Sequence, residues 1–184
     1  NTYAMARWAA ENFPEGTRVA NLGPDYAYGQ QCWEYFKAYA DGLGAGFEYG
    51  ESVFPSLGAS DMTPQINTII ADEPDLVFTS VWASDVVTFV TQAAEAGLFE
   101  EAEDVLSTIG AAPDVFAAVG DTMPEGVHWS AWYYHRAYDN DVNDTFLERY
   151  RNTYEGTDTL PLPSFTGGGS YAAPFFYKQA IENA

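Results

Sequence analysis

The stretch Pro74–Gly97, PDLVFTSVWASDVVTFVTQAAEAG, sets the fold class of the chain. Residues 75–80 form a short, almost continuous apolar run, which is typical of a strand covered on both faces. Residues 84–96 then read as a helix that ends before Gly97, a common residue after a helix. A buried strand followed closely by a helix is the repeating unit of a parallel α/β sheet.

The same alternation continues on both sides of this stretch. A helix capped by Asp61, with Pro64 in its first turn, is expected to end at Pro74. The other predicted helices cover residues 3–13 and 30–43, and the predicted strands cover residues 18–22, 47–54 and 105–109. We therefore expect an α/β fold, with a parallel sheet and helices on both faces.

The regular alternation of predicted strands and helices becomes less clear beyond residue 120. Residues 126–132 (GVHWSAW) predict one more strand, residues 139–144 an acidic loop, and residues 144–154 an amphipathic helix. A Pro/Ser/Gly stretch then leads to a last helix predicted from Tyr171. These changes place an organisational boundary near residue 128.

Charge narrows the classes of partner. Asp and Glu number 27 against 7 Lys and Arg, so the formal net charge is −20. Binding to nucleic acid or to an anionic membrane needs basic clusters, and we exclude both. The chain is nevertheless 47% hydrophobic, enough to build a core. Such acidity predicts a surface adapted to high salt, as in a halophile, with an ordinary acidic surface as the alternative.

The two ends of the chain and its single cysteine allow further predictions. The chain begins directly in a helical pattern and stops at Ala184 inside another, which predicts a fragment of a longer protein. No apolar run is long enough to span a membrane. Cys32 lies on the apolar stripe Cys32, Tyr35, Phe36 and Tyr39, and is interpreted as a buried residue rather than a reactive thiol.

Several catalytic and cofactor motifs fail on spacing. Gly167–Ala172 fits a loose dinucleotide pattern, but it follows Pro-Leu-Pro-Ser instead of a strand, so a hinge or loop is favoured. Asp139, Asp141 and Asn143 match three positions of a calcium-binding loop, but the glycine and the glutamate that such a loop requires are absent from the sequence that follows. The two histidines, His128 and His135, would need unrelated carboxylates to bind zinc. We predict no catalytic residues, no metal and no cofactor.

What remains is a set of loops after the predicted strands, where open α/β sheets bind ligands. Tyr26 and Tyr28 follow the first strand, and Trp82, Ser84 and Asp85 follow the third. Aromatic rings with polar tips, beside Ser and helix N-terminal amides, suit a small polar ligand. Packing is the alternative role for the rings, and a helix cap or turn is favoured for Asp85.

The order of these segments resembles a known family. GPDYAYGQ (residues 23–30), SVFPSLGASDMTPQI (52–66), EPDLVF (73–78) and VGDTMPEGV (119–127) look like the second lobe of a branched-chain amino-acid-type solute-binding protein of ABC transporters, with the type I periplasmic-binding fold. The resemblance implies that residues 1–128 form the second lobe of a two-lobed clamshell. Residues 129–184 would return through the hinge and associate with a missing first lobe.

The resemblance also implies a site. Tyr28 and Trp82 match aromatic residues that pack against the ligand in this family. The acidic residue that binds an amino-acid ammonium should fall near Ala111 or Ala112, and neither side chain can accept that charge. Alongside amino acids, the expected ligands therefore include urea, an amide or a small carboxylate. Asp85 or Asp114 could replace the lost carboxylate.

The resulting expectation is an extracytoplasmic component of an ABC importer that captures a small solute by hinge closure and delivers it to a permease, or the sensory lobe of a receptor. A lipid anchor upstream would hold it at the cell surface. The alternative from another class is an α/β enzyme or cofactor-binding domain that uses the same crevice. It would need a nucleophile and base or a phosphate cradle, which the motifs do not supply.

Overall fold

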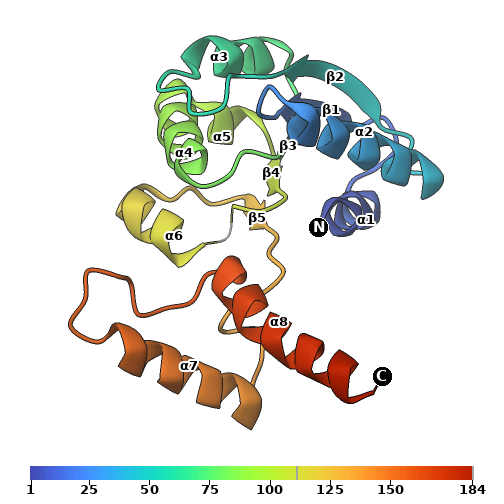
Figure 1. Ribbon diagram of the computed structural model, residues 1–184. Helices are drawn as coiled ribbons and strands as arrows, with labels where there is room; N and C mark the ends of the chain where they lie inside the picture. The colour runs from blue at the N-terminus through green and yellow to red at the C-terminus, as the bar shows by residue number, and fades with distance from the viewer. Residues whose placement is uncertain (111, 184) are drawn as a thin grey trace.

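The computed structural model describes residues 1–110 and 112–183. Strands and helices alternate through most of the chain, and two further helices lie apart from the sheet (Figure 1). The strands are β1 (Arg18–Leu22), β2 (Glu48–Val53), β3 (Leu76–Thr79), β4 (Asp104–Ser107) and β5 (Val127–Trp129). The helices are α1 (Thr2–Asn12), α2 (Ala27–Gly42), α3 (Thr63–Ala71), α4 (Ser84–Ala96), α5 (Leu98–Glu101), α6 (Pro113–Val119), the single turn η1 (Gly120–Thr122), α7 (Asp141–Tyr154) and α8 (Phe165–Glu182).

The five strands form one sheet in the order β2-β1-β3-β4-β5, and every neighbouring pair is parallel. All four residues of β3 are buried, as the continuous apolar run predicts. Its register is Val77 opposite Ala20 of β1 and Val105 of β4. The predicted α/β fold with a parallel sheet is confirmed.

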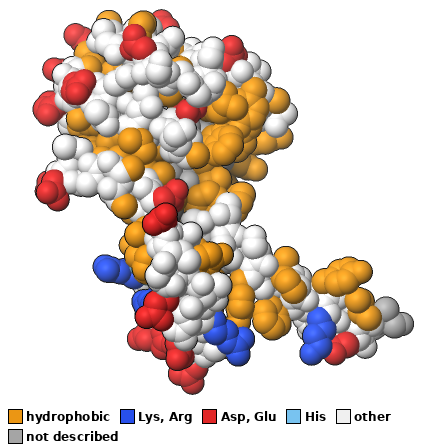
Figure 2. Space-filling view, turned by 60° about the vertical axis from the view of Figure 1, so that its left-hand side comes forward, with side chains coloured by type: hydrophobic (Ala, Val, Ile, Leu, Met, Phe, Trp, Pro, Cys, Tyr) orange, Lys and Arg blue, Asp and Glu red, His pale blue; other side chains and the backbone are white. Residues whose placement is uncertain are grey.

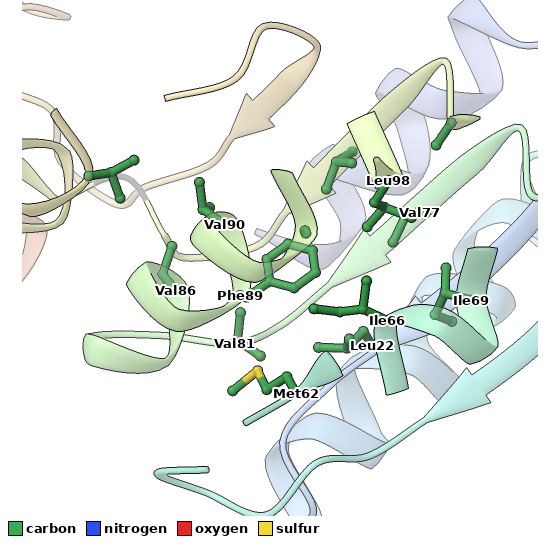
Figure 3. Close-up of a cluster of buried hydrophobic side chains, with 14 of the residues drawn as sticks. Leu22, Met62, Ile66, Ile69, Val77, Val81, Val86, Phe89, Val90 and Leu98 are labelled. Atoms are coloured by element: carbon green, nitrogen blue, oxygen red, sulfur yellow. The ribbon is translucent and has the colours of Figure 1, made fainter. Parts of the chain in front are cut away.

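Helices cover both faces of this sheet, and alternate strand residues point into two separate cores. Ala20, Val77 and Val105 face a cluster with α3, α4 and α6, where Phe89 and Ile66 are almost fully buried (Figure 3). Val19, Phe78 and Leu106 face the opposite cluster, with α1 and α2. There Phe36 stacks on Phe78, with ring centroids 4.5 Å apart. Cys32 lies in this second core and is buried, as predicted.

Several predicted boundaries are wrong. Helix α2 begins at Ala27 rather than residue 30, and the strand predicted over residues 126–132 is reduced to β5. Helix α3 begins at Thr63, although the Asp61 carboxylate does accept a hydrogen bond from the Thr63 N–H at 2.9 Å. The short helices α5 and α6 were not predicted.

The largest differences are in the C-terminal segment, residues 130–183. Helix α7 begins at Asp141 within the predicted acidic loop, because the Asn140 side chain accepts a hydrogen bond from the Asn143 N–H at 3.0 Å. Helix α8 begins at Phe165 rather than Tyr171 and includes Gly167–Gly169, which had been assigned to a hinge or loop. Ser164 caps it through the Gly167 N–H.

The C-terminal segment follows the α/β unit, residues 2–129, and α7 and α8 lie below the sheet in the view of Figure 1, with Phe165 at the start of α8 packed against the core of that unit. The two helices meet through Phe146 and Tyr171, whose ring centroids are 4.4 Å apart. No residue of α8 is buried. Large apolar side chains on α8 are 56–72% exposed, namely Phe175, Phe176, Tyr177 and Ile181.

Among residues 1–110 and 112–183, no helix is long and apolar enough to cross a membrane.

Candidate functional site

The strand order places a topological switch point between β1 and β3. The connection after β1 leads through α2 to β2 on one side, and the connection after β3 leads through α4 to β4 on the other. The two following loops therefore separate at this point. In open α/β sheets such a topological switch point, at the carboxyl ends of the strands, is where ligands bind. Tyr26 and Trp82 lie in the two loops that flank it.

The structure brings the predicted aromatic residues together across this switch point. The Trp82 indole N–H donates a hydrogen bond to the Tyr26 hydroxyl at 2.9 Å, although 56 residues separate them. The Tyr26 ring also stacks on Tyr28, with centroids 5.9 Å apart and 29° between the planes. Tyr26 and Trp82 remain 37% and 39% exposed, so both can contact a ligand. We call Tyr26, Tyr28 and Trp82 the aromatic trio.

Tyr28 is the deepest member of the trio. Its hydroxyl lies 3.3 Å from the hydroxyl of Thr108, which directly follows β4. Burial raises the pKa of Tyr28 to about 12, and the hydrogen bond with Thr108 opposes this effect only in part. Tyr28 is therefore a neutral hydroxyl at physiological pH. Its side chain links the first turn of α2 to the end of β4.

Two hydroxyl residues at the strand ends were missed by the sequence reasoning. Thr108 is buried, and its carbonyl accepts a hydrogen bond from the Asn1 amide at 2.8 Å. The Ser80 hydroxyl, just beyond β3, is fully buried and has no partner among the described residues. Both lie at the carboxyl-terminal ends of predicted strands, over residues 75–80 and 105–109, a position that could have marked them as part of this edge.

Backbone geometry holds the two loops in place. Gly29, in the first turn of α2, lies so close to Pro24 that an added Cβ would overlap the Pro24 carbonyl oxygen. Ala83, next to Trp82, has φ of 53°, which a residue with a side chain adopts at a cost of about 1–3 kcal/mol. Such strain is concentrated at functional sites in proteins.

The remaining predicted site residues have different surroundings. Ser84 is exposed at the start of α4. Asp85 is 4% exposed and its carboxylate accepts a hydrogen bond from the Gly58 N–H at 3.0 Å, so it ties the loop before α3 to α4. Of the cap or turn role favoured for Asp85, the cap is wrong, because Ala83 occupies that position, while the Asp85 N–H does bond the Trp82 carbonyl in a turn at 3.2 Å. Ala112 is buried at the start of α6, and Ala111 lies outside the described residues.

A hollow of about 700 Å³ lies between α1, α6 and β5, away from the switch point. His128 in its wall pairs with the Asp104 carboxylate at 2.8 Å and packs against Trp8, with ring centroids 3.9 Å apart and 35° between the planes. In the part of the chain that the structure describes, no three His, Cys, Asp or Glu residues gather as a metal site would require.

The parallel strand order, with aromatic residues at its switch point, defines the chain as a unit of the open α/β type. The family model described as "Periplasmic binding protein" matches residues 1–184, and the chain belongs to that family. No curated protein matches it. The predicted resemblance to a periplasmic binding protein is confirmed by this family model, and the fold is shared with a solved leucine-binding protein.

Solved structures share this fold. A leucine-binding protein LivK from Thermotoga maritima is 23% identical, with a TM-score of 0.78, and the match covers 99% of this chain and 49% of that one. An amino-acid ABC transporter substrate-binding protein from Pseudomonas fluorescens is 25% identical, with a TM-score of 0.72 and coverage of 89% and 44%. A Rhodopseudomonas palustris solute-binding protein, in complex with 3,4-dihydroxybenzoic acid, is 24% identical, with a TM-score of 0.72 and coverage of 99% and 47%. The chain thus spans just under half the length of these proteins.

Proposed function

We propose that this chain is part of the extracytoplasmic solute-binding component of an ABC importer. The observation that carries the proposal is the aromatic trio at the switch point, in a chain that belongs to the periplasmic binding protein family. Family membership implies a location outside the cytoplasm, and we propose a lipid anchor upstream of residue 1. The partner would be an ABC permease that accepts the released solute.

In this proposal the α/β unit is the second lobe of a clamshell, with its boundary at residue 128. Residues 129–184 would return through the hinge and pack with a first lobe. The exposed apolar side chains of α8 support this arrangement, because a helix with no buried residue needs a partner surface. The solved structures of about twice this length are consistent with a second half of the protein.

The proposed ligand contacts are Tyr26, Tyr28 and Trp82, with Ser84 at the rim. Asp85 would hold the loop that contains Gly58 in place instead of contacting the ligand, because its carboxylate already accepts a hydrogen bond from the Gly58 N–H. At position 112 an alanine offers no charge to an ammonium group. The ligand would be a small solute, either an amino acid, an amide such as urea, or a small carboxylate.

Binding would work by lobe closure. A solute that contacts both lobes favours the closed state by its differential affinity for that state. The aromatic trio supplies apolar surface and the loop amides supply hydrogen bonds, without any chemical step. An enzyme using the same crevice is the alternative, and it would require a catalytic nucleophile or base that we do not assign.

Calorimetry tests this proposal. The solute is first identified by mass spectrometry of what co-purifies with the full-length protein. Titration with that solute should show binding to the full-length protein and affinity at least about 100-fold weaker for residues 1–184, because half of the contacts are absent. Trp82→Ala in the full-length protein should cost at least about 1 kcal/mol of binding free energy. Equal affinities for the two lengths would refute the half-site arrangement.

A further inference from the structure

The surface that the aromatic trio leaves open has a specific chemical character. Resting on the function proposed above, we propose that the ligand presents an aromatic ring to this lobe, and that it is a monocyclic aromatic compound rather than an aliphatic amino acid or urea. Its ring would lie on the exposed parts of Tyr26 and Trp82, and any charged group that it carries would point away from this lobe.

The polar tips of the trio are largely used within the protein. The Trp82 indole has a single N–H donor, and Tyr26 accepts it. The Tyr28 hydroxyl is paired with Thr108. The groups that Tyr26 and Trp82 leave available to a ligand are therefore mainly ring surface. The only polar donor among them is the hydroxyl hydrogen of Tyr26. A phenyl or phenol ring matches this surface, because it stacks on aromatic residues and needs few hydrogen bonds.

No basic side chain stands in the described loops at this edge. Arg18 begins β1 at the opposite end of the sheet and pairs with Asp72, while Arg7 and Lys37 pair with glutamates of their own helices. The other four basic residues are Arg136, Arg149, Arg151 and Lys178, all in the C-terminal segment. In Figure 2 the visible Lys and Arg side chains likewise lie on the lower part of the molecule. A ligand carboxylate has no ion-pair partner in these loops.

A ligand ammonium group likewise finds no buried carboxylate that is free to pair with it in these loops. The buried carboxylate of Asp85 is bonded to Gly58. Asp25 and Asp114 are exposed, where an ion pair contributes little to binding. Without a buried partner for the ammonium or for the carboxylate, this lobe cannot select an α-amino acid by its charges.

The geometry of the rings favours a flat group over a bulky cation. Quaternary ammonium ligands are held by aromatic cages, whose ring faces converge on the cation. Here Tyr26 and Tyr28 stack with 29° between their planes, and the Trp82 indole N–H is bonded to the hydroxyl at the edge of Tyr26, so the rings do not converge on one point. Ala83, directly after Trp82, has a positive φ of 53°. The result is a wall rather than a cage.

Competition between matched ligands tests the inference on the full-length protein. Benzoate and cyclohexanecarboxylate have the same charge and nearly the same size, but only benzoate has a π-face. Benzoate should bind at least about tenfold more tightly, the scale of one or two aromatic contacts. It should also bind more tightly than leucine, urea or choline. Trp82→Leu and Tyr26→Leu should each reduce this preference, while cyclohexanecarboxylate affinity changes less than about threefold.

The outcomes separate the two proposals. Equal affinity for benzoate and cyclohexanecarboxylate, tighter binding of leucine, urea or choline, or no binding of benzoate would overturn the aromatic assignment. If the co-purified solute still binds and small-angle X-ray scattering shows that it makes the protein more compact, the solute-binding function stands without that assignment. If neither the co-purified solute nor any probe binds, both proposals fail.

Discussion

Tyr28→Phe tests whether the aromatic trio is packed as the structure shows. The unfolded chain ionises this tyrosine near pH 10, whereas burial raises the pKa of Tyr28 to about 12 in the folded protein. The stability that this shift represents is complete below about pH 10 and is lost as the pH rises towards 12. Two pKa units correspond to at most about 3 kcal/mol of unfolding free energy, and solvent screening at this partly exposed hydroxyl lowers that to about 2 kcal/mol, about half of it lost by pH 11.

Phenylalanine removes both the ionisation and the hydrogen bond to Thr108. At pH 8 the variant should be less stable than the wild type by about 1 kcal/mol, the net value of one hydrogen bond. At pH 11 this deficit should vanish or reverse, because only the wild type has lost the contribution of Tyr28. The assay is urea unfolding followed by circular dichroism at both pH values.

A matched control is Tyr35→Phe, an exposed tyrosine of the same helix, which should change the unfolding free energy at pH 8 by less than about 0.5 kcal/mol. The reasoning is refuted if Tyr28→Phe and the wild type lose the same unfolding free energy between pH 8 and pH 11. That result would mean that the Tyr28 hydroxyl is open to water and that the trio is not anchored through Thr108.

Three further predictions concern stability and are measured by denaturant unfolding. Phe36→Ala should cost about 3–5 kcal/mol, because Phe36 is fully buried against Phe78, whereas Tyr39→Ala on the exposed face of α2 should cost less than about 1 kcal/mol. A similar loss in both variants would contradict the assignment of the buried face. Gly29→Ala should cost at least about 2 kcal/mol, since its Cβ would overlap the Pro24 carbonyl oxygen, whereas Gly42→Ala meets no atom within 4 Å and should be neutral or stabilising. Lowering the salt from about 2 M to about 0.05 M KCl should reduce stability by at least about 1 kcal/mol, because repulsion among 27 acidic residues is then unscreened, and a midpoint indifferent to salt would contradict a salt-adapted surface.

The sheet was predictable because its signals are local. The apolar run of β3 and the following helix lie within 24 residues, and Gly97 ends α4 with φ of 84°, a conformation that glycine adopts at little cost. The alternation of such units is enough to define a parallel sheet. The start of α8 was not predictable from local signals, because there a helix cap and residues of low helix propensity favour different structures. Ser164 starts α8 in spite of three glycines in its first turns.

The candidate site was predictable only in part. Strand-end position identified Tyr26, Tyr28 and Trp82, but the bond from Trp82 to Tyr26 depends on β1 and β3 being neighbours, which no local pattern shows. Asp85 illustrates the limit. Its place after a strand is compatible with a ligand contact or a cap, and only the tertiary structure brings Gly58 to its carboxylate.

The central claim is that the aromatic trio is the half of a ligand site that this chain contributes. The most direct measurement is a crystal structure of the full-length protein with its co-purified solute. Our account predicts a solute enclosed between two lobes, with its atoms within about 4.5 Å of the rings of Tyr26 and Trp82. A solute bound elsewhere, or a trio covered by the protein's own side chains in the closed state, would contradict it.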